Sequence, residues 1–341
     1  MSQCDGPSRT CGATILDADG LRLSADEIAF FREADPFGFI LFARNIEHPD
    51  QVRALCADMR NAVGRDCLIT IDQEGGRVQR LRAPIWREWL PPLDFVAAAG
   101  ARAERAMYLR YALIAEELTA IGIDSNCAPM VDVAEGMTHD FLRNRCYGTD
   151  PKTVAALGRA AGQGMLDHGV LPIVKHIPGH GRATMDSHFD LPRVAAGRNA
   201  LNGWDFAPFA ALADMPMAMT AHIVYAALDE APATLSPKVI EVIRQDIGFE
   251  GLLMTDDIAM NALQGDLAAN AASAIAAGCD VVLHCNGTLA ERQAVAAAAG
   301  TMTPGAQARA DAVMARRRPA HVDFSVLDAE LEALMGGQGD G

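Results

Sequence analysis

The chain has 341 residues, of which 50% are hydrophobic, and its formal net charge is −15. A chain of this size and apolarity can bury a large core, either as two ordinary domains or as one large α/β barrel. The excess of acidic residues argues against nucleic acid or an anionic membrane as the main partner, because such surfaces attract basic proteins.

The eight cysteines form no C-x-x-C pair and no regular framework. Cys67, Cys127 and Cys279 lie in or beside apolar runs, where a buried free thiol is expected. The first residues, "MSQCDGPSRTCG", include no apolar signal-peptide core, and no run approaches eighteen apolar residues. These features predict a protein of the reducing cytoplasm that has no membrane partner.

Eight short apolar runs recur along the chain, and most of them end in polar residues. The runs begin at Ala13, Gly38, Cys67, Ile123, Val170, Met217, Gly251 and Asp280. Near-continuous apolar runs of this length are typical of strands that are buried on both faces. They therefore predict a parallel sheet covered by helices.

Helical patterns lie between most of these runs. Ser24 and Glu27 form a capping box ahead of the first one. Amphipathic or alanine-rich patterns predict further helices at residues 50–63, 101–121, 151–168, 236–247, 264–277 and 288–299. The spacing between runs averages roughly 35–40 residues, which agrees with βα units of about 30 residues or more.

Eight such units predict a (β/α)8 barrel, whose functional residues lie at the carboxyl ends of its strands. A doubly wound open sheet is the alternative, although no G-x-G-x-x-G motif follows the first run. We expect a single catalytic domain over residues 1–341, with the barrel core at about 13–300. Residues 301–335 are predicted to form helices on the outside of the barrel, and residues 336–341 a disordered tail.

Polar side chains at the ends of the runs would meet at one mouth of such a barrel. They are Asp72, Glu74, Asp132, Lys175, His176, His222, Asp256 and Asp257, with Arg80 and Arg145 in the loops that follow. Any one of them alone can be a capping residue at a strand–loop junction. Together, at so many strand ends, they favour an active site.

His176 and His180 are spaced like the two zinc ligands of a helical metal site. Pro178 and Gly179 lie between them, and these two residues disfavour the helix that such a pair needs. No H-E-x-x-H motif is present. The sequence therefore predicts no metal and no other cofactor, with a metal-dependent barrel hydrolase as a less favoured alternative.

Acid–base chemistry agrees better with the residues. Asp186 precedes His188 by two positions, and a carboxylate beside an imidazole orients the ring and tunes it as a proton carrier. Asp256 ends an apolar run and is a natural carboxylate nucleophile. A carboxylate nucleophile with a separate acid/base group is the arrangement of a retaining glycosidase, here with a histidine in place of the second carboxylate.

Five motifs in this order resemble family 3 glycoside hydrolases, and more closely the bacterial β-N-acetylglucosaminidases of cell-wall recycling. They are "DQEGGRVQR", "IDSNCAPMVDV", "KHIPGHGRATMDSH", "TAHIVY" and "GLLMTDDIAM". The resemblance extends from about residue 13 to 287. Departures include Ile177, where the family usually has an aromatic residue, and His284 in a strand that is usually more aliphatic. We interpret His284 as a mouth-facing or hydrogen-bonded core histidine.

The resemblance implies a role for each matching residue. Asp256 would be the nucleophile, and His188, paired with Asp186, would be the acid/base group. Asp257 would have a structural role beside them. The residues that would bind the non-reducing sugar are Asp72, Arg80, Arg145, Lys175 and His176.

The resemblance also implies a small-molecule substrate, N-acetylglucosamine (GlcNAc) β-1,4-linked to 1,6-anhydro-N-acetylmuramic acid, with or without a peptide. Retention would follow from a glycosyl-aspartyl intermediate on Asp256. The alternative route is assistance by the N-acetyl group, held by Asp256 and Asp257. Alternative functions are a β-glycosidase of broader specificity and a catalytically silent sugar-binding barrel. No feature of the sequence predicts the oligomeric state.

Overall fold

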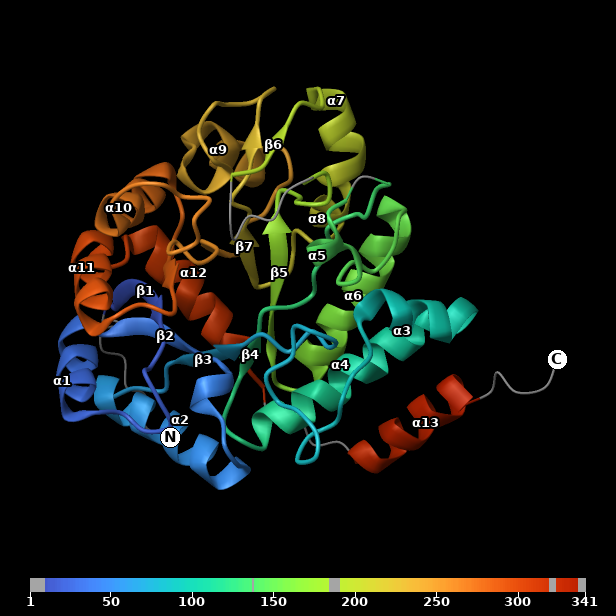
Figure 1. Cartoon of the computed structure of the whole chain (residues 1–341), viewed down its shortest axis with the longest axis horizontal. Coiled ribbons are helices and arrows are strands. Elements are labelled where there is room, and N and C mark those ends of the chain that lie inside the picture. The colour runs from blue at the N-terminus through green and yellow to red at the C-terminus, as the bar shows by residue number, and fades with distance from the viewer. Residues whose placement is uncertain (1–9, 137, 184–190, 319–322, 337–341) are drawn as a thin grey trace.

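The computed structural model describes residues 10–136, 138–183, 191–318 and 323–336 (Figure 1). Eight strands coincide with the eight predicted runs, which confirms the strand prediction. These strands are β1 (Gly12–Leu16), β2 (Pro36–Leu41), β3 (Leu68–Ile71), β4 (Ser125–Asn126), β5 (Leu171–Ile177), β7 (Met217–Thr220), β9 (Leu252–Met254) and β10 (Val282–His284). Two further short strands, β6 (Arg193–Val194) and β8 (Val224–Tyr225), pair only with each other in the described chain.

The eight strands pair in parallel in two sheets, with the orders β10-β1-β2-β3 and β4-β5-β7-β9. Backbone hydrogen bonds join the two sheets at both edges. The Cys127 amide of the segment after β4 donates to Ile71 of β3 (2.8 Å), and the Thr255 amide after β9 donates to Val281 before β10 (3.0 Å). The result is a ring of eight parallel strands, so the predicted (β/α)8 barrel is confirmed and the open sheet is excluded.

Helices follow the strands and cover the outside of the ring (Figure 1). The first, α1 (Ala25–Ala34), begins with the capping box that Ser24 and Glu27 predicted. The other helices up to α11 are α2 (Pro49–Val63), α3 (Pro92–Ala99), α4 (Ala103–Thr119), α5 (Asp140–Arg143), α6 (Pro151–Asp167), α7 (Arg198–Ala200), α8 (Ala207–Ala211), α9 (Pro237–Gln245), α10 (Leu267–Ala277) and α11 (Leu289–Ala299), of which the short α5 lies at the pocket rather than outside the ring. Of these, only the short helices α3, α5, α7 and α8 lack a counterpart among the predicted helices.

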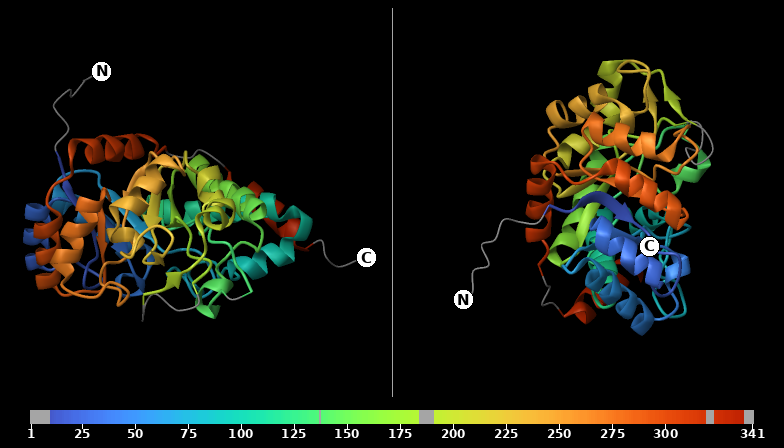
Figure 2. Two further views of the ribbon diagram at one scale, coloured as in Figure 1. Left: turned by 90° about the horizontal axis from the view of Figure 1, so that it is seen from above. Right: turned by 90° about the vertical axis from the view of Figure 1, so that its left-hand side faces the viewer.

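Two C-terminal helices, α12 (Pro304–Ala315) and α13 (Phe324–Gly336), pack outside the barrel as predicted (Figure 2). The chain ahead of α12 crosses the amino-terminal end of the barrel, where the Met302 amide donates to Cys11 (2.9 Å). Arg105 of α4 holds Glu330 of α13 through two hydrogen bonds of 2.7 and 2.6 Å. The predicted tail falls almost entirely on residues outside the described ranges.

The core is formed by the strand side chains and by the inner faces of the helices. The seven cysteines of the described ranges are buried and free, and they include Cys67, Cys127 and Cys279, as predicted. Within those ranges, every helix is too short or too polar to cross a bilayer. The carboxyl ends of the barrel strands lie at one face of this core, where residues from several strands can form a site.

Candidate active site

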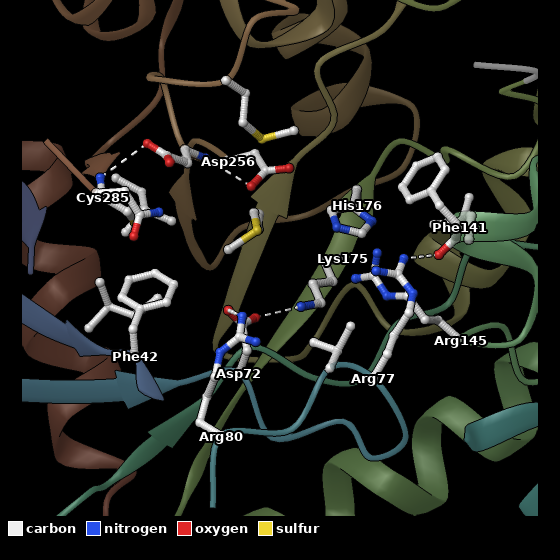
Figure 3. Close-up of a pocket in the computed structure, with 18 of the residues that line it drawn as sticks. Phe42, Asp72, Arg77, Arg80, Phe141, Arg145, Lys175, His176, Asp256 and Cys285 are labelled. Carbon is white, nitrogen blue, oxygen red and sulfur yellow. Dashed lines mark hydrogen bonds and ion pairs between the residues drawn. The ribbon is translucent and has the colours of Figure 1, made fainter. Parts of the chain in front are cut away.

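A pocket of about 460 Å³ opens at the carboxyl ends of the barrel strands (Figure 3). Six predicted site residues lie in its wall, although they come from positions far apart in the sequence. These residues are Asp72, Arg80, Arg145, Lys175, His176 and Asp256. The predicted acid/base pair, Asp186 and His188, lies outside the described residues, so its placement stays a prediction.

Five charged side chains form one connected group, which we call the ion-pair wall: Asp72, Glu74, Arg80, Arg145 and Lys175. The Lys175 ammonium lies between Asp72 Oδ1 (3.0 Å) and Glu74 Oε1 (2.6 Å). Arg145 donates two parallel hydrogen bonds to the Glu74 carboxylate, of 2.9 and 2.8 Å. Arg80 donates to the other oxygen of Asp72 at 3.0 Å. Each carboxylate therefore has two cationic partners.

These ion pairs keep the buried groups of the wall charged. Burial by itself raises the pKa of Glu74, but Arg145 and Lys175 outweigh it and bring the pKa to about 2. The pKa of Asp72 is also lowered, since Lys175 and Arg80 overcome the effect of burial. Conversely, burial lowers the pKa of Lys175, yet Asp72 and Glu74 raise it above its ordinary value. The wall is thus a fixed array of charged donors and acceptors at neutral pH.

Lys175 and His176 are neighbours in β5, yet both line the pocket. In a regular strand, consecutive side chains point to opposite faces. The pairing of β5 with β7 shifts register between Lys175 and Ile177. Such an irregularity re-aims side chains, as β-bulges near active sites do, and it brings the predicted Lys–His pair to one cavity.

Behind His176 lies Asp132, whose carboxylate is fully buried. Its Oδ2 atom is 2.7 Å from His176 Nδ1, and its Oδ1 atom accepts the His180 amide at 2.5 Å. Burial raises the pKa of Asp132, but the His176 and His180 rings more than compensate and lower it. The backbone from Pro178 to His180 is not helical, as Pro178 and Gly179 predicted. Within the described ranges, no group of three or more acidic, cysteine or histidine side chains could hold a metal ion.

Asp256 and Asp257 follow β9 and line the pocket. Asp256 lies across the cavity from Asp72 and Arg80 (Figure 3). Burial raises the pKa of Asp256, but His176 and His222 outweigh it, so that its pKa is lowered and the carboxylate is ionised. For Asp257, burial dominates and raises the pKa to about 7, although its Oδ1 accepts amides from Ala259 (3.0 Å) and Cys285 (3.1 Å). Two adjacent aspartates thus differ in charge near neutral pH.

Two histidines near these aspartates support the site from outside the pocket lining. His222 donates from Nε2 to the Asp257 carbonyl (2.9 Å), and its Nδ1 lies 2.8 Å from the Thr234 hydroxyl. His284 is fully buried, and its Nδ1 is 3.9 Å from Asp257 Oδ1. Neither ring nitrogen of His284 has a hydrogen-bond partner among the residues that the structure describes. His284 is therefore a core histidine, as one of the two interpretations had it, but the hydrogen bond expected for it is not formed with the described residues.

The sequence assigned no role to several residues that shape the pocket. The Arg80 guanidinium lies over the Phe42 ring, with its Cζ atom 5.4 Å from the ring centroid. Arg77 donates a hydrogen bond to the Phe141 carbonyl at the rim of the pocket. Phe42 lies in the apolar run that begins at Gly38, and Arg77 belongs to the motif "DQEGGRVQR", so the sequence contains a signal for both. Glu74 was noted only as a polar strand end, and its place at the centre of the ion-pair wall comes from the structure.

Comparisons with known proteins agree with this geometry. Residues 34–320 match the family described as "Glycosyl hydrolase family 3 N terminal domain". A β-hexosaminidase of Alkalilimnicola ehrlichii is 40% identical over 285 residues, which cover 81% of each chain. The crystal structure of NagZ from Neisseria gonorrhoeae superposes with a TM-score of 0.83 at 28% identity, covering 97% of this chain and 98% of that one. The same protein is also known in complex with N-trifluoroacetyl-D-glucosamine (TM-score 0.82, 28% identity, 97% and 98% covered).

Proposed function

Because the chain belongs to glycosyl hydrolase family 3, we propose that it is a β-N-acetylhexosaminidase that removes terminal GlcNAc from its substrate. The observation that carries this proposal is the pocket, where Asp256 faces the ion-pair wall across one cavity. A cavity of about 460 Å³ lies within the usual range for small-molecule sites. Small amino sugars are also bound by a similar protein, the Neisseria gonorrhoeae NagZ.

The ion-pair wall is suited to hold a sugar. A pyranose ring carries several hydroxyl groups, and each of them both donates and accepts hydrogen bonds. Arg80, Arg145 and Lys175 offer donors at the pocket, while Asp72 offers acceptors. Because these groups are already paired, and Arg145 and Lys175 are also buried, they need little reorganisation when a sugar binds. We assign Asp72, Arg80, Arg145, Lys175 and His176 to substrate binding.

The proposed reaction is a double displacement with retention of configuration. The ionised Asp256 carboxylate attacks the anomeric carbon, a new C–O bond forms, and the glycosidic C–O bond breaks. His188, paired with Asp186, protonates the departing oxygen. A water molecule then attacks the anomeric carbon of the glycosyl-aspartyl intermediate and gives a proton to His188. The bond from that carbon to the aspartate oxygen breaks, which releases the sugar and restores the Asp256 carboxylate. The low pKa of Asp256 supports the nucleophile assignment, because only the carboxylate form can attack.

The proposed substrates are peptidoglycan fragments, namely GlcNAc linked to 1,6-anhydro-N-acetylmuramic acid with or without a peptide. We place the enzyme in the cytoplasm. Both assignments rest on the sequence resemblance, and the name NagZ of a structural neighbour supports the first. The cysteine usage supports the second, since seven described thiols are buried and free.

The test compares release of the aryl group from an N-acetyl-β-glucosaminide, a β-glucoside and a β-xyloside. We expect clear preference for the amino sugar, whereas equal rates would indicate a broader β-glycosidase. No turnover of any of them would indicate a silent sugar-binding barrel. A fluorinated substrate that traps the sugar, followed by peptide mass analysis, should locate it on Asp256. A lack of any trapped adduct would favour assistance by the N-acetyl group.

A further inference from the structure

We propose that Asp132 is a positioning residue that fixes the tautomer of His176 and so presents its Nε2 atom to a hydroxyl group of the bound sugar. This inference rests on the proposed function, because it concerns how the same pocket holds its sugar. It assigns a specific role to Asp132, a residue that does not line the pocket and that the sequence indicates only as a polar strand end.

The hydrogen-bond pattern shows which atoms of this pair carry protons. Both oxygens of Asp132 face groups that can only donate, namely the backbone amides of His176 (3.3 Å to Oδ2) and His180 (2.5 Å to Oδ1). The carboxylate therefore acts as an acceptor on both sides. Its third partner, His176 Nδ1 at 2.7 Å, must then be the donor. A proton on Nδ1 follows from this geometry alone.

The tautomer determines what the other side of the ring can do. A ring that carries its single proton on Nδ1 presents Nε2 as a bare acceptor. His176 lies in the pocket wall between Lys175 and Asp256 (Figure 3). Its Lys175 neighbour can only donate hydrogen bonds, so the imidazole supplies an acceptor that the cations of the wall cannot. The opposite tautomer would place an N–H there and lose the bond to a hydroxyl proton.

Asp132 also joins this ring to the turn that follows β5. Its bond to the His180 amide holds the turn from the inside, and Thr138 donates to the Gly181 carbonyl at 2.6 Å. Gly181 has no room for a side chain, because a Cβ atom would lie 1.9 Å from the Val133 carbonyl oxygen. The segment around Asp132 and the turn are thus packed backbone against backbone, which leaves the His176 ring little freedom to rotate.

The test is Asp132→Asn, which preserves the shape but places an amide against His176 Nδ1. The amide can donate to that nitrogen and so favours the opposite tautomer. Asp124→Asn is the matched control, because Asp124 flanks the same short strand, is also buried, and accepts the Ile69 amide (2.8 Å) far from the pocket. We expect kcat/KM for the aryl N-acetyl-β-glucosaminide to fall about 10- to 100-fold in Asp132→Asn. The control should remain within about threefold of the unmodified enzyme.

A double-mutant cycle separates positioning from a general structural role. If Asp132 acts through His176, the variant Asp132→Asn/His176→Phe should be no less active than His176→Phe alone. If the loss of activity in the double variant equals the product of the losses in the two single variants, the two residues act independently and the proposal is overturned.

A second measurement needs no folded variant. In the unmodified protein labelled with ¹⁵N-histidine, the neutral His176 ring should show a protonated Nδ1 and an unprotonated Nε2. The reverse pattern, or protons on both ring nitrogens, would overturn the proposal even if Asp132→Asn failed to fold. An unmodified enzyme that does not cleave the amino sugar would refute the proposed function instead, and the ring measurement would still decide the role of Asp132.

Discussion

The two sides of the pocket use the same residue types in opposite ways. On the ion-pair wall, Glu74 has Arg145 and Lys175 as partners, and its pKa falls to about 2. On the opposite side, which we call the aspartate wall (Asp256, Asp257 and His284 behind them), Asp257 has a pKa of about 7. Both carboxylates are largely buried. The difference therefore arises from their partners, since two cations outweigh the cost of burial and two backbone amides do not.

This contrast separates binding from chemistry. A fully paired wall keeps its charges over the whole physiological pH range and offers the sugar a constant set of donors and acceptors. The aspartate wall leaves Asp256 ionised and without a direct cationic partner in the described chain, so its carboxylate is free to react. Each prediction below tests one side of this comparison.

The largest effect is expected for Asp256→Ala. This variant removes the covalent path, so kcat should fall by more than about 10⁴-fold. KM should change much less, because the ion-pair wall remains intact. Added azide should restore part of the turnover and give the glycosyl azide of inverted configuration, which chromatography against standards can detect. Near-normal turnover of the variant without azide would contradict the nucleophile assignment.

Glu74→Gln tests the ion-pair wall. The substitution leaves the Lys175 and Arg145 charges buried with one carboxylate fewer between them, so we expect a loss of about 3 kcal/mol in the free energy of unfolding. Misplaced donors should also lower kcat/KM by about 10²- to 10³-fold, largely through KM. Urea unfolding and steady-state kinetics measure both effects.

The matched control for this substitution is Glu88→Gln, since the Glu88 ion pair with Arg82 is exposed at the surface. It should cost less than about 1 kcal/mol. An equal loss in both variants would mean that the ion-pair wall contributes no more than a surface pair.

Asp257 predicts a specific pH dependence of stability. The folded protein keeps a proton on this carboxyl group up to a pKa of about 7, whereas the ordinary value is 3.8. The resulting contribution to stability is complete below about pH 4 and is lost as the pH rises through 7. Its upper limit is about 4 kcal/mol, and we expect about half of that because the side chain is 16% exposed. Asp257→Asn, which cannot ionise, should flatten the decline between about pH 4 and pH 7 in urea unfolding. An unchanged slope would show that another group titrates.

The sequence predicted the fold and six members of the pocket because both are encoded in short segments. Each strand is one apolar run, and residues such as Asp72 and Lys175 end those runs or belong to recognisable motifs. The sequence does not predict which side chains these residues contact. Whether Glu74 meets Lys175, 101 positions away, depends on strand register and on the irregularity in β5, and neither feature has a local sequence signal.

His284 shows the same limit on the aspartate wall and gives the smallest expected effect. The sequence predicts a hydrogen-bond partner for a buried histidine here, but within the described ranges neither ring nitrogen of His284 has one. An unpaired buried polar group costs about 1–3 kcal/mol, and an aliphatic side chain of similar size has no such cost. His284→Leu should therefore raise the free energy of unfolding by about 1 kcal/mol and leave kcat/KM unchanged, as measured by urea unfolding and by hydrolysis of the aryl substrate. A destabilised variant would mean that the imidazole stabilises the aspartate wall through its Nδ1, which lies 3.9 Å from Asp257 Oδ1. The aspartate wall would then depend on a paired carboxylate, as the ion-pair wall does.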